Sequence, residues 1–301
     1  MKTIIPRCLL SFVLIATSLA NAADFAAELK AKQQSGSARE IQEFIEKSYE
    51  ANKTDPTYFV ASANALWKLA SEPNISTKPA EPGDYALVDA KTGKAAGSIS
   101  TSGRVNPALQ KKAASLLDEA YREFPSRLDI GMGLAHLRRQ MNEPSQCATA
   151  LIQVLTNSQK LADKLQWKDG GPLPEPAADY VPSLMQPYAA GFFHLDSKEG
   201  DALCRRLCEK VVQTYPESPY AYNMLAALSD ASGDQKAAIK YLLTAHAKAP
   251  KDAIVIFNLA DMYRTTGDKT NALKYYRKVL ALNPDTEMKK SAQTAIAGLE
   301  K

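Results

Sequence analysis

The sequence has few of the residues that usually mark a chemical or disulfide-bonded site. Among 301 residues, four are cysteine, three are histidine and two are tryptophan. So few cysteines exclude a disulfide-dense miniprotein. Lysine and arginine number 37 against 33 acidic residues, and a formal charge of +4 is too near balance to indicate nucleic acid as the main partner. With 45 % apolar and 23 % charged residues, the chain is neither disordered nor collagen-like.

The sequence motifs of common enzymes are missing as well. No histidine belongs to an HExxH metal motif, and no GxSxG nucleophile elbow occurs. Lys91-Thr92-Gly93 has no SxxK partner, so it does not complete a serine β-lactamase site. Gly93-Lys94 lacks the first glycine and the hydroxyl residue of a phosphate-binding loop. We therefore predict a protein that is not an enzyme and needs no cofactor.

The N-terminus has the features of an export signal. Lys2 and Arg7 give a short positively charged region before an apolar run, Cys8–Ala20, and Ala20-Asn21-Ala22 gives the small-x-small pattern of a cleavage site. The run is shorter than the roughly 20 residues that a membrane span needs, and no later run is long enough either. We predict a signal peptide at 1–22, cleaved after Ala22. The mature protein would then reach the periplasm or the outside without a membrane span.

An internal repeat is the strongest positive signal. A glycine, an alanine and a proline each recur at a spacing of about 34 residues. The recurring pairs are Gly233 and Gly267, Ala238 and Ala272, and Pro250 and Pro284. Glycine suits the end of a first helix, the small alanine lets the two helices of a hairpin approach closely, and proline ends the second helix. The pattern predicts stacked helix hairpins.

This pattern resembles the tetratricopeptide repeat (TPR). Residues 253–286 match best, residues 219–252 match nearly as well, and residues 185–218 match more weakly. The resemblance implies an all-α fold, a right-handed solenoid of helix hairpins. It also implies that the first helices of the repeats line a concave binding surface.

Within residues 71–105 the sequence pattern predicts strands rather than helices. Tyr85–Val88 and Ala96–Ile99 flank a glycine-containing turn, which predicts a small β-hairpin insert. The predicted order is a signal peptide (1–22), degenerate repeats with the insert at 71–105 (23–127), a degenerate repeat with a proline-rich loop at 162–184 (128–184), three repeats (185–218, 219–252 and 253–286), and a C-terminal capping helix (287–301).

The resemblance places function on the concave surface. In the TPR family the second, fifth, ninth and twelfth positions of a repeat face the groove. The corresponding residues are Phe193, Tyr220, Asn223, Asp230, Ile254, Phe257, Asp261 and Arg264. Aromatic and arginine side chains are frequent binding hot spots, so we predict a scaffold or adaptor that binds a protein or peptide segment. The alternative is that the aromatic side chains pack against the next repeat. The family's carboxylate clamp is represented only by Asn258.

Two further hypotheses stay open. The inserts at 71–105 and 162–184 suit an immunity or inhibitor protein that neutralises a toxin or hydrolase, because long loops in compact folds tend to be functional. Cys204 and Cys208 together with His194 suit a soft-metal site. The simpler interpretation of Cys147, Cys204 and Cys208 is that they are structural and form at most one disulfide.

Overall fold

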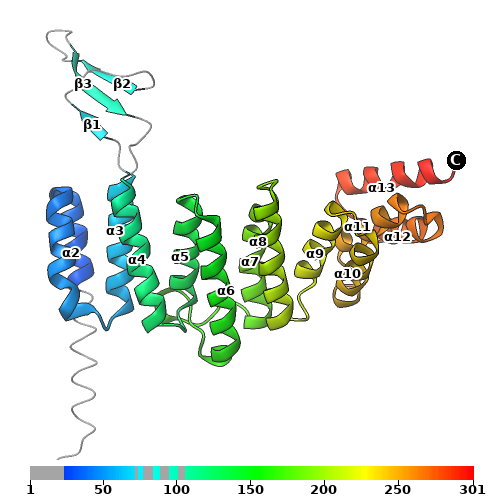
Figure 1. Ribbon diagram of the computed structural model, residues 1–301, viewed down its shortest axis with the longest axis horizontal. Helices are drawn as coiled ribbons and strands as arrows, with labels where there is room; N and C mark the ends of the chain where they lie inside the picture. The colour runs from blue at the N-terminus through cyan, green and yellow to red at the C-terminus, as the bar shows by residue number, and fades with distance from the viewer. Residues whose placement is uncertain (1–23, 72–73, 77–83, 89–94, 101–105) are drawn as a thin grey trace, which may run out of the picture. The chain divides into compact units, whose positions relative to one another are not determined.

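A computed structural model describes residues 24–71, 74–76, 84–88, 95–100 and 106–301 (Figure 1). The predicted signal peptide lies outside these residues, as does the turn at 89–94. The chain divides into two compact units, and the boundary in the sequence falls between Asn142 and Glu143. Both are built mainly of helices, which confirms the all-α class.

The first unit packs helices around an aromatic core. A helix over 24–35 is followed by α2 (Ala38–Asn52), α3 (Pro56–Ala70), α4 (Pro107–Glu123) and α5 (Leu128–Gln140). α3 packs against α4, although the insert separates them in the sequence. The Tyr58 hydroxyl donates a hydrogen bond to the Ile45 carbonyl oxygen at 2.7 Å and so joins α3 to α2.

The insert is a three-stranded antiparallel sheet rather than a simple hairpin. Its strands are β1 (Asn74–Ser76), β2 (Asp84–Val88) and β3 (Ala95–Ser100), in the order β1-β3-β2. The prediction lacked β1, because three residues are too few to show an alternating pattern. Two strands alone are marginally stable in water, and the pairing of Ile75 with Ile99 adds a third.

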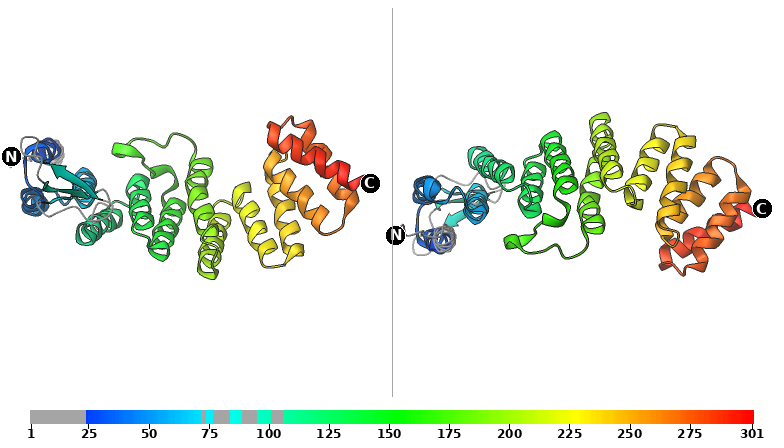
Figure 2. Two further views of the ribbon diagram at one scale, coloured as in Figure 1. Left: turned by 90° about the horizontal axis from the view of Figure 1, so that it is seen from above. Right: turned by 90° about the horizontal axis from the view of Figure 1, so that it is seen from below.

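The second unit is a succession of antiparallel helices (Figure 2). Its helices are α6 (Pro144–Leu161), α7 (Ala177–Phe193), α8 (Lys198–Thr214), α9 (Pro219–Ala231), α10 (Gln235–Lys248), α11 (Ala253–Thr265), α12 (Lys269–Ala281) and α13 (Thr286–Leu299). Short 3₁₀ turns at Ala162–Lys164 and Lys168–Gly170 lie in the connection from α6 to α7. From α8 onward, each helix packs against the next.

The tight turns between paired helices follow from local chemistry. Gly233 and Gly267 have φ angles of 83° and 81°, which residues with a side chain rarely adopt. The aspartate after each glycine caps the following helix, as where the Asp234 carboxylate accepts a hydrogen bond from the Ala237 N–H at 3.0 Å. Ala238 and Ala272 are fully buried in the core cluster of this unit.

The C-terminal helix completes the core of this unit. Ala292 of α13 is fully buried against the cluster that contains Leu259 and Tyr276, and Met288, Ala295 and Leu299 pack around it. α13 lies on α12. Residues of α11 and α13 together line part of the candidate site.

Candidate functional site

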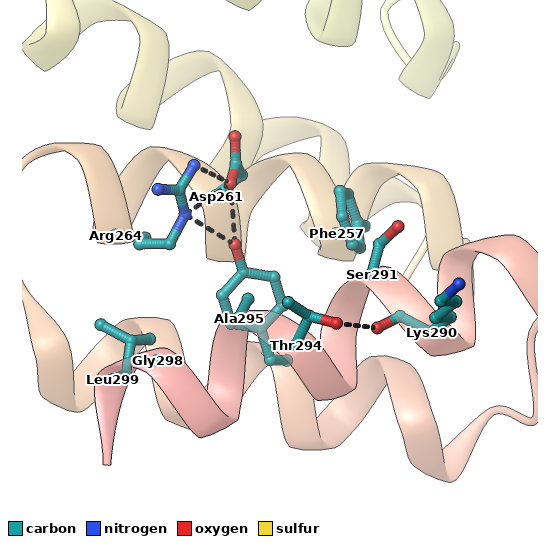
Figure 3. Close-up of a pocket in the computed structure, with 10 residues that line it drawn as sticks. Phe257, Asp261, Arg264, Lys290, Ser291, Thr294, Ala295, Gly298 and Leu299 are labelled. Atoms are coloured by element: carbon teal, nitrogen blue, oxygen red, sulfur yellow. Dashed lines mark hydrogen bonds and ion pairs between the residues drawn. The ribbon is translucent and has the colours of Figure 1, made fainter. Parts of the chain in front are cut away.

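Two clefts adjoin α11 in the second unit. The first cleft has a volume of about 190 Å³ and is lined by Asn223, Ala226, Ala227, Asp230, Leu242, Asn258, Asp261, Met262 and Thr265. The second cleft has a volume of about 690 Å³ and is lined by Phe257, Asp261, Arg264, Tyr276, Lys290, Ser291, Thr294, Ala295, Gly298 and Leu299 (Figure 3). Asp261 lines both clefts, so they adjoin each other along α11.

A pair of amide side chains marks the first cleft. The Asn258 Nδ2 atom of α11 donates a hydrogen bond to the Asn223 Oδ1 atom of α9 at 2.9 Å. Each amide has two N–H donors and a carbonyl with two lone pairs, so this bond uses only part of their capacity. The remaining groups are the type that recognises a peptide backbone, which presents the same N–H and C=O functions.

An aspartate, an arginine and a tyrosine form a network in the wall of the second cleft (Figure 3). The Tyr276 hydroxyl donates to Asp261 Oδ1 at 2.8 Å, and the Arg264 Nε and Nη2 atoms donate to the same oxygen at 2.8 and 2.6 Å. Arg264 Nε also lies 3.2 Å from the Tyr276 hydroxyl oxygen. The network joins α11 to α12 and fixes the direction of the Asp261 and Arg264 side chains.

The network also shifts the pKa values of Tyr276 and Arg264. Burial, followed by the hydrogen bond to Asp261, raises the pKa of Tyr276 to about 12, so the phenol stays neutral at physiological pH. The hydrogen bond to Asp261 raises the pKa of Arg264, which remains a cation. The carboxylate and the guanidinium therefore form an ion pair that neutralises both charges.

Five of the eight residues predicted from the repeat positions line these clefts. Asn223 and Asp230 lie in the first cleft, Phe257 and Arg264 lie in the second, and Asp261 lies in both. The Phe257 ring is half-buried, with its centroid 5.6 Å from that of Tyr276 in an edge-to-face arrangement.

The other three predicted residues lie outside the clefts. The Tyr220 hydroxyl donates a hydrogen bond to the Gln186 carbonyl oxygen at 2.8 Å, which joins α9 to α7. Ile254 is 57 % exposed at the start of α11. Phe193, at the end of α7, has its ring centroid 6.0 Å from that of His194.

The contribution of α13 does not follow from the repeat positions. Lys290, Ser291 and Thr294 form the far wall of the second cleft. The family positions concern only the first helices of repeats, so they say nothing of a helix that follows the last repeat. From the sequence, Asn258 is only a remnant of the carboxylate clamp, whereas the structure pairs it with Asn223.

The cysteines form no metal site in the described part of the chain. Cys147, Cys204 and Cys208 are buried and form no disulfide with one another, and the hydrogen bond to Cys204, together with burial, raises the pKa of Cys208. Within the described ranges no three His, Cys, Asp or Glu side chains are grouped to hold a metal ion, so His194 does not join the two thiols of α8. No helix in these ranges is both long and apolar enough to cross a membrane.

Comparison with known families gives one match. The tetratricopeptide-repeat family matches residues 253–286, which contain α11 and α12. Residues 253–286 form a tetratricopeptide repeat. This TPR supplies one wall of each cleft, and its tight turn is the one at Gly267. TPR proteins generally mediate protein–protein interactions.

Several solved TPR structures resemble the chain at a distance. YrrB, described as a TPR protein with an unusual peptide-binding site, is 13 % identical with a TM-score of 0.43, over 83 % of this chain and 97 % of YrrB. MamA is 15 % identical with a TM-score of 0.39, over 63 % and 95 % of the two chains. Pseudomonas aeruginosa pilF is 15 % identical with a TM-score of 0.40, over 65 % and 84 %. Likenesses this weak carry no argument about this chain, and no curated protein matches its sequence.

Proposed function

We propose that this protein is an exported, non-enzymatic scaffold that binds an extended protein or peptide segment in the two clefts along α11. The observation that carries the proposal is that the two clefts are adjacent and share Asp261 as a lining residue, with the Asn223–Asn258 pair in one and the Phe257 ring in the other. Amide groups suit the backbone of an extended segment, and an aromatic surface suits one of its apolar side chains.

The chemistry of the clefts favours binding over catalysis. Neither histidine nor cysteine lines them. The Asp261 carboxylate, which lines both clefts, is held by the Arg264 cation and by the Tyr276 phenol, whose pKa of about 12 keeps it protonated. We therefore assign these residues to recognition.

Photo-crosslinking in the cell envelope tests the binding proposal. A photoreactive residue replaces Thr265 in the first cleft, and crosslinked products are compared between the otherwise unchanged protein and the Asn223→Ala/Asn258→Ala double variant. Loss of the products in the double variant, with an unchanged far-ultraviolet circular dichroism spectrum, is expected. The control is Gln293→Ala, an exposed amide of α13 outside the clefts, which should keep the products.

A second variant distinguishes binding in the clefts from binding by the insert at 71–105. A short Gly-Ser linker replaces residues 71–105, and the same crosslinks are expected to persist. Products that survive the double variant but vanish with the linker would overturn the proposal in favour of the inhibitor hypothesis, in which the insert binds.

Export is tested by fractionation. The full-length chain should be recovered from the periplasm or the medium with Ala23 as its first residue, as N-terminal sequencing would show. Recovery of uncleaved protein with the cytosolic marker would contradict the export proposal and leave the binding proposal standing.

A further inference from the structure

The charged residues of the two clefts are arranged from negative at one end, through neutral, to positive at the other. The first cleft holds Asp230 at the end of α9, an exposed carboxylate without an ion-pair partner among the residues that the structure describes. Its other acidic residue, Asp261, is paired with Arg264, and no lysine or arginine of the described chain lines the first cleft, so Asp230 is its one unpaired charge. This end of the clefts is therefore negative.

The centre of the clefts is electrically neutral. Asp261 faces both clefts, and its carboxylate is bound by the Arg264 guanidinium at 2.6 Å. The Tyr276 hydroxyl and both Arg264 donors bond to the same oxygen, Asp261 Oδ1, so that oxygen has little hydrogen-bonding capacity left for a ligand. The paired charges contribute little at the distance of a bound segment.

The second cleft ends in a positive charge. Lys290 of α13 is exposed, and its ammonium group has no acidic partner in the described part of the chain. The apolar side chains of Phe257, Ala295 and Leu299 line the same cleft. This cleft thus offers an apolar wall and one free cation.

We propose that the clefts select a dipolar segment: a peptide with a basic side chain at the Asp230 end, an acidic side chain at the Lys290 end and an apolar side chain between them against Phe257. This inference rests on the proposed binding function and specifies its partner. A segment with two charges of one sign would place a like charge against Asp230 or against Lys290. Like-charge contacts are a common way to reject wrong partners.

Four synthetic peptides test the inference. Each has ten residues with blocked termini, a central leucine and a neutral background, and carries a charged residue on both sides of the leucine: Lys and Glu, Glu and Lys, Lys and Lys, or Glu and Glu. Fluorescence anisotropy measures their affinity for the protein. The better dipolar peptide is expected to bind about 3- to 10-fold more tightly than either like-charged peptide, since exposed ion pairs are individually weak. At about 0.5 M salt the preference should fall towards unity.

Reversing the charge of Lys290 or Asp230 should change which of the four peptides binds most tightly. Lys290→Glu makes both ends negative, so the doubly basic peptide should become the tightest ligand. Asp230→Lys makes both ends positive and should favour the doubly acidic peptide. The control variants Lys289→Glu and Glu209→Lys reverse exposed charges of α13 and α8 outside the clefts and should keep the dipolar preference.

The outcomes separate the two proposals. If all four peptides bind equally and the Asn223→Ala/Asn258→Ala variant weakens all of them, the binding function stands and the charge inference is wrong. If a like-charged peptide is preferred by the unchanged protein, the inference is also wrong. If none of the peptides binds at millimolar concentration, the proposed function itself is overturned.

Discussion

The hydroxyl of Tyr276 should stabilise the second unit measurably, and Tyr276→Phe removes it alone. The ring is fully buried in the core cluster of the last repeat, and phenylalanine preserves its volume, so no cavity forms. What is lost is the 2.8 Å hydrogen bond to the Asp261 carboxylate and the 3.2 Å contact with Arg264. The variant therefore measures one polar contact without a packing change.

The expected cost is about 1.5 kcal/mol in the free energy of unfolding. Hydrogen bonds to charged groups contribute about 1.5–3 kcal/mol. Here Asp261 is only half-buried and keeps its two bonds from Arg264, so the removal leaves no unsatisfied charge and the lower end applies. Urea unfolding followed by circular dichroism gives the value.

The pH dependence supplies a second readout. Burial raises the pKa of Tyr276 to about 12 in the folded protein, whereas an unfolded tyrosine titrates near pH 10. Stability from this group is thus fully present below about pH 10 and is lost as the pH rises through about 12, because the unfolded chain releases the proton first. The stability gap between the unchanged protein and Tyr276→Phe should therefore narrow from pH 10 upward.

A matched variant controls for the loss of any tyrosine hydroxyl. Tyr241 of α10 is half-buried, and its hydroxyl has no hydrogen bond to the residues that the structure describes, so Tyr241→Phe should stay within about 0.5 kcal/mol. Equal effects of the two variants at pH 7, or a gap for Tyr276→Phe that is constant up to pH 12, would refute the reasoning.

Three further predictions concern local features of the second unit. Ala272→Leu should lower the free energy of unfolding by about 1–3 kcal/mol, because the larger side chain overpacks the core. Ala281→Leu, at an exposed position of α12, should leave it unchanged. Similar urea midpoints for the two variants would contradict the predicted packing of α11 against α12. Asp252→Ala should cost about 1 kcal/mol because the carboxylate caps α11 through the Ile254 and Val255 N–H groups, and an unchanged melting temperature would count against this. The buried thiols of Cys147, Cys204 and Cys208 should react with Ellman's reagent only after denaturation. Rapid labelling of the native protein would contradict their burial.

The parts of the fold that were predictable are those set by short-range chemistry. A glycine followed by aspartate ends one helix and caps the next within a few residues, so Gly233 and Gly267 revealed the turns directly. Buried alanines at matching positions revealed where helices meet. Such signals need no knowledge of distant partners, and the period of the repeat then extends them along the chain.

Features that depend on distant pairing were not predictable in the same way. β1 is only three residues long and pairs with β3 across a long stretch of sequence, so no local pattern identifies it. The second position of a repeat likewise does not fix the surroundings of a side chain. Tyr220 and Ile254 share that position, yet Tyr220 is bonded to α7 whereas Ile254 is exposed.

The second cleft shows the same limit at the candidate site. Periodicity identified the apolar face of α13, because Ala292 and Ala295 recur at helical spacing and pack on the core. It did not identify which polar residues would face α11. Lys289 and Lys290 are neighbours in sequence but point about 100° apart around the helix, and only Lys290 lines the cleft. Which lysine serves in binding is therefore decided by how α13 lies on α12, and charge reversal at these two positions isolates that packing from overall charge.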